Sequence, residues 1–516
     1  MSDTDPMALN YHAAPNAKRL LWAGFVAILA AGIGFSVRGA SVLGAWSQDF
    51  GFTQTELGGI TGGGLVGFGI VIIISSILAE SVGYSRLMYF AFGTHFLSAV
   101  VTLAAPSVYA SAGKDATYWT LYVGMFLFAI GNGVAEAVVN PLTATLFPNN
   151  KTHYLNILHA GWPAGLILGG VASIFMADTF SWQAQISLFL IPVVLYGIMI
   201  FGQKTPSANT SGVSIGQIVA QFAAPILLFL LIIHAMVGYV ELGTDSWIAR
   251  ITGSILDETT GRWLFVYTSA LMFILRFVAG PIVHKISPLG LLLISAILAT
   301  IGLYTLGGVG TTAAALAALT IYGLGKTFFW PTMLAVVSER FPKGGAVTLG
   351  VIGGVGMLSA GLLGGPGIGF KQDKYASEKL QEVSAPTYDR YKAGKENSFL
   401  VFKTNGLDGQ KVSILGDGGA TLDADRAILA ESGATDDKLE LLNAWWEDAK
   451  ATVDTDKAPV QEATLHGSRM ALKLTAVVPA VMGVCYLLLI LYFKATGGYK
   501  PLVINEDGSV SEAAGH

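Results

Sequence analysis

Residues 128–148 read FAIGNGVAEAVVNPLTATLFP, and this stretch decides how the chain folds. It lies inside a long apolar run, yet it carries Asn132, Glu136 and Asn140. A charged side chain in the middle of a membrane helix costs roughly 2.5–3.5 kcal/mol on the insertion scale. Such residues are rare unless they serve a function, so the stretch predicts a membrane helix that carries a polar site.

The same pattern returns in residues 322–342, which read YGLGKTFFWPTMLAVVSERFP. When the two stretches are superposed, Lys326 falls on Asn132, and both stretches close with Phe-Pro followed by polar residues. Internal repeats with polar groups near the middle of the bilayer are typical of secondary transporters. The chain is therefore predicted to consist of two related halves.

The composition is that of a membrane protein with many spans. Of the 516 residues, 53% are hydrophobic and 12% are charged, whereas about 25% are charged in a typical soluble domain. The net charge of −4 gives no indication of nucleic-acid binding. The single cysteine, Cys485, excludes an internal disulfide and a thiolate metal site. The sequence has no metal-ligand cluster and no phosphate-binding loop, so no cofactor and no ATP hydrolysis are expected.

Twelve apolar runs are each long enough to span the bilayer as a helix, which takes about 20 residues. We place them at 19–46, 56–79, 86–106, 117–147, 153–176, 183–202, 218–250, 260–284, 289–309, 312–341, 346–369 and 469–493. We expect an all-α membrane protein of twelve transmembrane helices in two pseudo-symmetric six-helix halves. The predicted domains are the N-terminal half (1–203), a cytoplasmic linker (204–217), helices seven to eleven (218–370), a polar outer insert (371–467), and helix twelve with a cytoplasmic tail (468–516).

Lysine and arginine in the short loops predict the orientation, because they concentrate on the cytoplasmic side. With the N-terminus inside, ten of them fall in cytoplasmic segments and three in outer loops. Both termini are then cytoplasmic, in agreement with an even number of spans. The N-terminal segment lacks the apolar region of a cleaved signal peptide, so the first span is expected to direct the chain to the cell membrane, which is the inner membrane in a bacterium.

The insert differs sharply in composition from the rest of the chain. Residues 371–466 carry 18 Asp and Glu against 12 Lys and Arg, a net charge of −6. Residues 399–415 alternate enough to predict a small hairpin around a Gly-containing turn. Residues 436–453 predict an amphipathic helix with apolar side chains at positions i, i+3 and i+7. A small folded cap and a flexible loop both remain open as interpretations of the insert.

Few charged residues lie inside the predicted spans. They are Arg38 in span one, Glu136 in span four, Glu241 and Asp245 in span seven, Arg276 in span eight and Lys326 in span ten. Apart from Arg276, all of them lie on spans one, four, seven and ten. Random placement does not produce this regular spacing by three.

With these features the chain resembles the major facilitator superfamily, whose fold is two six-helix halves. The resemblance covers all twelve spans and implies that helices one, four, seven and ten line a central cavity. The segments after spans two and eight, SSILAESVGYSRL and GPIVHKISP, resemble degenerate forms of the family's inner-loop gating motif. The resemblance therefore implies gating roles for Glu80 and Arg86.

Within the superfamily, the chain is most similar to the fucose–galactose–glucose proton symporters. Helix four of the fucose permease carries a glutamate four residues before an Asn-Pro pair, and here Glu136 stands four residues before Asn140 and Pro141. Arg38 replaces the acidic residue that the family has in helix one, and Lys326 is not part of the family's pattern. The resemblance implies sugar transport driven by protons.

The candidate site combines coupling, substrate-binding and gating residues. Coupling is assigned to Glu136, Lys326 and Arg38, and substrate binding to Asn140, His159, Trp162, Tyr239, Glu241 and Trp330. We expect Glu136 and Lys326 to form a buried pair, which either titrates as a unit during transport or only fixes the packing of the halves. Arg38 either takes part in coupling or turns its head outward to the interface. The two tryptophans either stack on a sugar ring or pack in the core, and Arg276 is expected to be structural.

The sequence thus predicts a secondary active transporter that works by alternating access and is not an enzyme. The favoured cargo is a sugar or similar small polar solute, moved together with a proton carried by Glu136; sodium is the other candidate coupling ion. The transporter is expected to act as a monomer in the lipid bilayer. Two alternatives stay open. One is an organic anion transporter in which Arg38 and Lys326 bind a carboxylate, and the other is a membrane sensor that does not transport.

Overall fold

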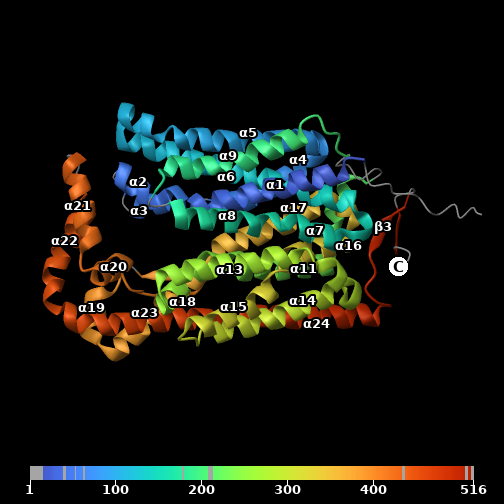
Figure 1. The fold of residues 1–516 in the computed structure, drawn as a ribbon. Coiled ribbons are helices and arrows are strands. Elements are labelled where there is room, and N and C mark those ends of the chain that lie inside the picture. Colours follow the sequence, from blue (N-terminus) through green and yellow to red (C-terminus); the bar gives the residue numbers. More distant parts are fainter. Residues whose placement is uncertain are drawn as a thin grey trace, which may run out of the picture.

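The chain is almost entirely helical (Figure 1). The computed structural model describes residues 15–38, 42–50, 52, 54–61, 64–176, 179–206, 213–394, 396–432, 436–505 and 509–512. Within these residues, eleven helical segments are long and apolar enough to cross a membrane, judged by length and composition. A twelfth helix, α13 (Glu258–Arg276), is more polar because three of its 19 residues are charged. The fold is that of an all-α membrane protein with twelve transmembrane helices in two six-helix halves.

The first six spans form the N-terminal half. Its helices are α1 (Ala17–Ser36), α2 (Val42–Phe50), α3 (Gln54–Thr61), α4 (Gly64–Val82), α5 (Tyr84–Leu103), α6 (Ala105–Leu146), α7 (Lys151–His159), α8 (Gly161–Met176) and α9 (Trp182–Ile200). The helical run of α6 breaks at Gly113, whose φ of 77° suits glycine because glycine has no Cβ. Span four therefore begins after this glycine.

The remaining six spans form the C-terminal half. Its helices are α10 (Ile215–Gln221), α11 (Pro225–Gly238), α12 (Thr244–Ile255), α13, α14 (Ala279–Leu306), α15 (Thr312–Lys326), α16 (Phe329–Arg340), α17 (Gly345–Ser359), α18 (Gly365–Val383), α23 (Val453–Thr475) and α24 (Val477–Ala495). A tail follows, in which β3 (Leu502–Ile504) pairs antiparallel with β4 (Val510–Glu512). The second sequence that resembles the gating motif lies in the first turns of α14, which bends at Ser287.

Two spans of the C-terminal half are interrupted where they meet. A π-helical turn, Tyr239–Gly243, separates α11 from α12, and another, Ala360–Gly364, separates α17 from α18. The two turns pack so closely that a methyl group on Gly243 would lie 2.7 Å from the Cα atom of Gly364. Turns of this kind often occur at functional sites, and the first one contains Glu241.

The internal repeat is visible in the backbone. α6 and α16 each end at a phenylalanine of nearly the same conformation, with φ −131° and ψ 62° at Phe147 and φ −128° and ψ 57° at Phe341. A short 3₁₀ turn follows each of them, Pro148–Asn150 and Pro342–Gly344. The predicted relation between the two halves is therefore confirmed at this point of the chain.

The insert is a folded cap in its described residues, not a flexible loop. It consists of α19 (Ala385–Tyr391), β1 (Asn397–Phe399), β2 (Phe402–Thr404), α20 (Gly409–Asp417), α21 (Ala420–Ser432) and α22 (Asp437–Ala449). It lies at the left of Figure 1, at the end of the bundle opposite to the C-terminal tail. We call these two ends the insert end and the terminal end. The predicted amphipathic helix is confirmed as α22, whose Leu439, Leu442 and Trp446 lie in the core of the cap.

The predicted hairpin is wrong in its position and its turn. β1 and β2 form a short antiparallel hairpin that reverses at Leu400 and Val401 and ends at Thr404, whereas the prediction placed the hairpin at 399–415 around a Gly-containing turn. The later residues form α20 instead, because the Asp408 side chain accepts hydrogen bonds from the backbone N–H groups of Gln410 and Lys411. An aspartate in this position caps the start of a helix and favours it over an extended strand.

Spans eleven and twelve continue beyond the apolar core into the insert. α18 and α23 pack along each other, and Lys379 of α18 lies 3.5 Å from Glu462 of α23. A methyl group on Gly467 would lie 2.4 Å from the carbonyl oxygen of Gln372, so the two backbones approach closely at this glycine. Residues 371 and 467, the predicted limits of the insert, therefore lie inside helices.

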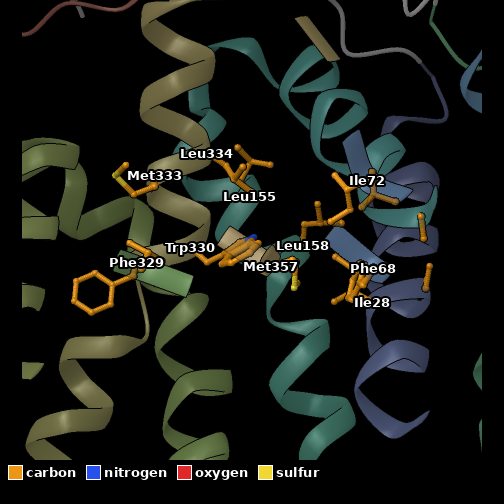
Figure 2. Close-up of a cluster of buried hydrophobic side chains, with 14 of the residues drawn as sticks. Ile28, Phe68, Ile72, Leu155, Leu158, Phe329, Trp330, Met333, Leu334 and Met357 are labelled. Atoms are coloured by element: carbon orange, nitrogen blue, oxygen red, sulfur yellow. The ribbon is translucent and has the colours of Figure 1, made fainter. Parts of the chain in front are cut away.

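A buried apolar cluster joins the two halves (Figure 2). Trp330 of α16 and Met357 of α17 come from the C-terminal half, and Leu158 of α7 and Phe68 of α4 come from the N-terminal half. All four side chains are almost fully buried in the structure. Apolar packing of this kind holds the halves together in the conformation described here.

Candidate site between the two halves

Glu136 lies in a hydrogen-bonded chain of three side chains. The Asn140 amide nitrogen, one turn further along α6, donates to Glu136 Oε2 at 2.7 Å. The amide oxygen of Asn140 accepts a hydrogen bond of 2.8 Å from His159 Nε2. All three side chains are buried. The structure thus brings together three predicted site residues, and the described partner of the carboxylate is an amide, not a cation.

Arg276 connects the hydrogen-bonded series Glu136–Asn140–His159 to the C-terminal half. Its Nη1 donates to the carbonyl oxygen of His159, across the boundary between the halves. Its Nη2 lies 2.8 Å from Glu241 Oε1, and its Nε donates to the carbonyl oxygen of Thr327 at 3.0 Å. The other oxygen of Glu241 accepts from the backbone N–H of Trp330 at 3.2 Å. Arg276 and Glu241 therefore form a buried ion pair in which each of the three guanidinium nitrogens donates to an acceptor.

Lys326 pairs with Asp245, and this corrects the sequence prediction. The Nζ atom of Lys326 contacts Asp245 Oδ1, and the two side chains are 0% and 7% exposed. The predicted partner was Glu136, whose carboxylate is held by Asn140 instead. Asp245 lies one turn after Glu241 on span seven, next to span ten, so its carboxylate reaches the lysine first. The two pairs leave Glu136 without a lysine or arginine within salt-bridge distance in the described residues.

Arg38 is buried just beyond α1, which contradicts the alternative that its head turns outward to the membrane surface. The side chain is 1% exposed. Its guanidinium lies 4.4 Å from the ring centre of Phe128 and 4.7 Å from that of Phe189, and Nη2 donates to Ser98 Oγ at 2.9 Å. Cation–π contacts from two rings hold the head in a fixed position inside the N-terminal half.

A cavity of about 290 Å³ lies between the halves, on the side of the insert end. The N-terminal half contributes Phe35, Arg38, Asn132 and Trp162 to its lining, and the C-terminal half contributes Ser246 and Gly361. The lining is mostly apolar and aromatic, with few polar groups, as is usual for sites that bind small molecules.

The cavity is closed toward the terminal end by contacts between the halves, which we call the terminal gate. Lys151 Nζ donates to the carbonyl oxygen of Ser338 at 3.1 Å, and the Thr152 hydroxyl donates to Glu339 Oε1 at 3.3 Å. The hydroxyl of Tyr499, in the segment before the tail strands, donates to Glu339 Oε2 at 2.6 Å. The C-terminal tail is thus attached to the same carboxylate that joins the halves.

The remaining predicted site residues lie apart from one another. Trp162 lines the cavity, but Trp330 packs its indole against His234, with ring centres 4.6 Å apart, inside the cluster of Figure 2. The Tyr239 hydroxyl accepts from Lys371 Nζ at 2.9 Å, near the base of the insert. Of the predicted gating pair, Arg86 is exposed, and the Glu80 side chain lies outside the described residues.

Sequence reasoning assigned no partner to two residues of this site. Asp245 was noted without a partner, and Arg276 was expected to be structural because span eight is not a principal cavity helix. Both prove to neutralise a buried charge of the site. The number of charges inside the spans already contained a signal for such pairs. Three basic and three acidic residues lie there, and a charge in an apolar medium is costly unless it has a partner of opposite sign.

A sequence profile of the major facilitator superfamily matches residues 22–365. The chain belongs to this superfamily. The match covers eleven of the twelve spans and stops before the insert. No curated protein sequence matches the chain.

Solved structures of this superfamily share the fold at low sequence identity. The E. coli fucose:proton symporter FucP is 18% identical, with a TM-score of 0.56 over 70% of this chain and 92% of that one. The E. coli xylose transporter XylE is 14% identical, with a TM-score of 0.54 over 68% of this chain and 91% of that one. A bacterial homologue of the human lysosomal transporter Spinster is 15% identical, with a TM-score of 0.56 over 92% and 97%. At these identities the likeness establishes the fold.

Proposed function

We propose that this transporter moves a sugar or a similar small polar solute in symport with a proton, and that Glu136 carries the proton. The observation that supports this most directly is the pairing of the buried charges. Glu241 and Asp245 each contact a cation, whereas the described partner of the Glu136 carboxylate is the amide of Asn140.

This difference decides which carboxylate can take up a proton at low cost. Protonating Glu241 or Asp245 would leave Arg276 or Lys326 as a lone buried cation, which is strongly unfavourable. Protonating Glu136 removes a buried negative charge and leaves no cation without its counter-ion. Glu136 is therefore the carboxylate of the site that is suited to load and release a proton during transport.

The network around Glu136 offers a route from proton binding to movement of the halves. Asn140 donates to the ionised carboxylate and accepts from His159, whose carbonyl oxygen is bound by Arg276 of the other half. A protonated Glu136 is a weaker acceptor for the Asn140 amide than the carboxylate is. We expect the weaker bond to loosen Asn140 and His159, and through the backbone of His159 to weaken the contact with Arg276 between the halves.

The lining of the cavity supports a small ring-shaped solute. Phe35 and Trp162 line it, with ring centres 5.4 Å apart, and aromatic faces suit the C–H face of a sugar. FucP and XylE, whose structures share this fold, are described as fucose:proton and xylose:proton symporters. The proposal rests on the charge pairing within this chain, and these neighbours favour the same class of cargo.

The test is uptake into proteoliposomes that contain the purified full-length protein. A panel of labelled sugars and sugar acids is first screened by thermal shift, and each ligand that stabilises the protein is then assayed under an imposed pH gradient. Glu136→Gln should abolish accumulation against a gradient but keep exchange of labelled for unlabelled solute. Glu258→Gln, which changes an exposed carboxylate, is the matched control and should accumulate solute as the wild type does.

Two results would contradict the proposal. Accumulation by Glu136→Gln equal to that of the wild type would remove Glu136 as the carrier. Failure of the wild-type protein to exchange any solute that it binds would instead favour the alternative of a sensor that does not transport.

A further inference from the structure

The guanidinium of Arg38 has two nitrogen atoms without a hydrogen-bond partner among the described residues. Nε and Nη1 make no hydrogen bond with any other described residue, although the side chain is 1% exposed. A guanidinium carries five N–H donors, and Nη2 alone donates, to Ser98 Oγ. A buried cation with unused donors is costly, so this position is unfavourable unless something else supplies the missing acceptors.

No carboxylate of the described residues neutralises Arg38. Glu241 is paired with Arg276 and Asp245 with Lys326, and the carboxylate of Glu136 is bound by Asn140. Arg38 also lines the cavity between the halves, together with Asn132 and Trp162. The free donors therefore belong to a side chain that borders the space where a solute would bind.

We infer that the transported solute carries a single negative charge, a carboxylate, and that Arg38 binds it. This inference rests on the proposed function and names the class of its cargo: a small hydroxylated carboxylic acid such as a uronic acid, which keeps the sugar ring. A carboxylate matches the planar fork of a guanidinium in charge and geometry. The two neighbouring rings, Phe128 and Phe189, fix the fork before the solute arrives.

The shape of the cavity limits the solute further. Its volume of about 290 Å³ lies at the lower end of the range for ligand pockets, which favours a monosaccharide-sized molecule. Asn132 and Ser246 add polar groups for hydroxyls, and Phe35 and Trp162 add flat apolar surface for a ring. Lys326 is not available as a second anion site, because Asp245 occupies it. One unpaired cation is suited to one anionic group.

The inference has a consequence for the charge that crosses the membrane. A solute with one negative charge that moves with one proton carries no net charge, whereas a neutral sugar that moves with one proton carries one positive charge. Uptake of the acid should therefore respond to an imposed pH gradient and not to an imposed membrane potential. This readout depends on the charge of the solute and not on how well a variant folds.

The experiment compares D-gluconate and D-glucuronate with D-glucose as the matched neutral sugar and with glucose 6-phosphate as a more highly charged anion. Binding to the full-length protein is measured by calorimetry, and uptake into proteoliposomes is measured under a pH gradient or a potassium diffusion potential. We expect at least one acid to bind more tightly than glucose and the phosphate ester. Arg38→Gln should weaken acid binding roughly ten- to hundredfold, the loss of a hydrogen bond to a charged group.

Two further variants separate the role of the charge from that of folding. Arg38→Lys keeps the charge but loses the fork, so it should retain part of the acid affinity. Arg262→Gln removes an exposed arginine that is paired with Glu258, and it should bind the acid as the wild type does. Retention of the helical circular-dichroism signal in Arg38→Gln shows that its loss of binding is local.

The outcomes distinguish this inference from the proposed function. A wild-type protein that binds glucose in preference to every acid, and whose uptake of glucose moves charge, overturns the inference and leaves proton-coupled sugar transport standing. Binding of no acid, equal acid affinity in Arg38→Gln, or preference for glucose 6-phosphate also overturns it. Acid binding that depends on Arg38, without exchange or uptake, supports the anion site and contradicts the proposed transport.

Discussion

At the scale of single residues, the buried charges of this transporter are distinguished by their partners. Arg276 and Lys326 each hold a carboxylate of span seven, while Glu136 and Arg38 lie outside these pairs. A paired charge mainly maintains the structure, because removing its partner leaves the other charge alone in an apolar medium. An unpaired charge is free to bind something that moves. We accordingly propose that Glu136 serves coupling and that Arg38 serves recognition of the solute.

The pairing of Lys326 is open to a direct test by double mutation. Lys326→Ala should destabilise the protein strongly, because removal of one partner of a buried pair costs roughly 3–5 kcal/mol. Adding Asp245→Asn should recover most of the lost stability, since no lone charge remains. The measurement is thermal unfolding of the purified variants in detergent. As a control, Glu136→Gln added to Lys326→Ala should give no such recovery, and recovery by that variant would restore the pair that the sequence had predicted.

At the scale of elements, the insert is built on two transmembrane helices and is not simply attached to them. α18 and α23 leave the bundle side by side and carry the cap of α19 to α22 at their ends. Lys371 of α18 donates to Tyr239 near the π-helical turn of span seven, so the base of the insert is also part of the transporter. The change in composition at residue 371 marks where the surroundings become polar and not where a new structural unit begins.

This arrangement predicts which deletion the protein tolerates. Removing residues 385–452 and joining α18 to α23 with a short Gly/Ser bridge should leave a folded transporter, because the contact of Lys379 with Glu462 and the packing around Gly467 remain. Removing residues 371–466 should lower the melting temperature further, since that cut takes away the paired helices. The melting temperatures of both deletion variants are measured without solute and with a solute that stabilises the full-length protein. Loss of this stabilisation in the well-folded shorter deletion would show that the cap helps to form the site.

At the scale of the whole molecule, the structure combines a closed terminal gate with a cavity toward the insert end. The Tyr499 hydroxyl supports this gate from the C-terminal tail through Glu339, which also binds Thr152 of the other half. Arg340, which follows Glu339 in the sequence, donates to the carbonyl oxygen of Lys500 at 2.5 Å and holds the tail next to the gate. The tail therefore favours the closed state of the gate.

Tyr499→Phe should shift the protein toward states with an open terminal gate. A hydrogen bond to a charged group contributes about 1.5–3 kcal/mol, so its loss is large enough to change the population of the two states. Spin labels at Asn149 and Lys343, one on each half, should report longer distances in this variant by electron spin resonance. Tyr492→Phe, at an exposed tyrosine of α24, is the control and should leave the distances unchanged. Unchanged distances in Tyr499→Phe would show that the tail does not act on the gate.

The orientation in the membrane remains a prediction from the lysine and arginine distribution. The insert end should face outward and the terminal end inward. In a Cys485→Ala background, an impermeant thiol reagent added to intact cells should label a cysteine at Ser432 of α21 and not one at Ser511 of β4. Labelling at 511 and not at 432 would reverse the orientation.

The sequence by itself determined the architecture, because membrane helices are specified locally. A run of about 20 apolar residues must form a helix in the bilayer, where no water can satisfy the backbone. The spans and the repeat that ends at Phe147 and Phe341 could therefore be read from the chain alone. The helix α22 was also predictable, since its apolar spacing is a local pattern.

Only the tertiary structure decided which charges meet. A salt bridge depends on distances between helices that are far apart in sequence, and three acids and three bases permit many pairings. Lys326 reaches Asp245 and not Glu136, and Arg276 of a helix outside the predicted set holds Glu241. The rings of Phe128 and Phe189 hold Arg38 inside the bundle at the edge of the cavity. The unpaired states of Glu136 and Arg38 follow from this packing, because their place relative to the other charges is set by how the helices assemble.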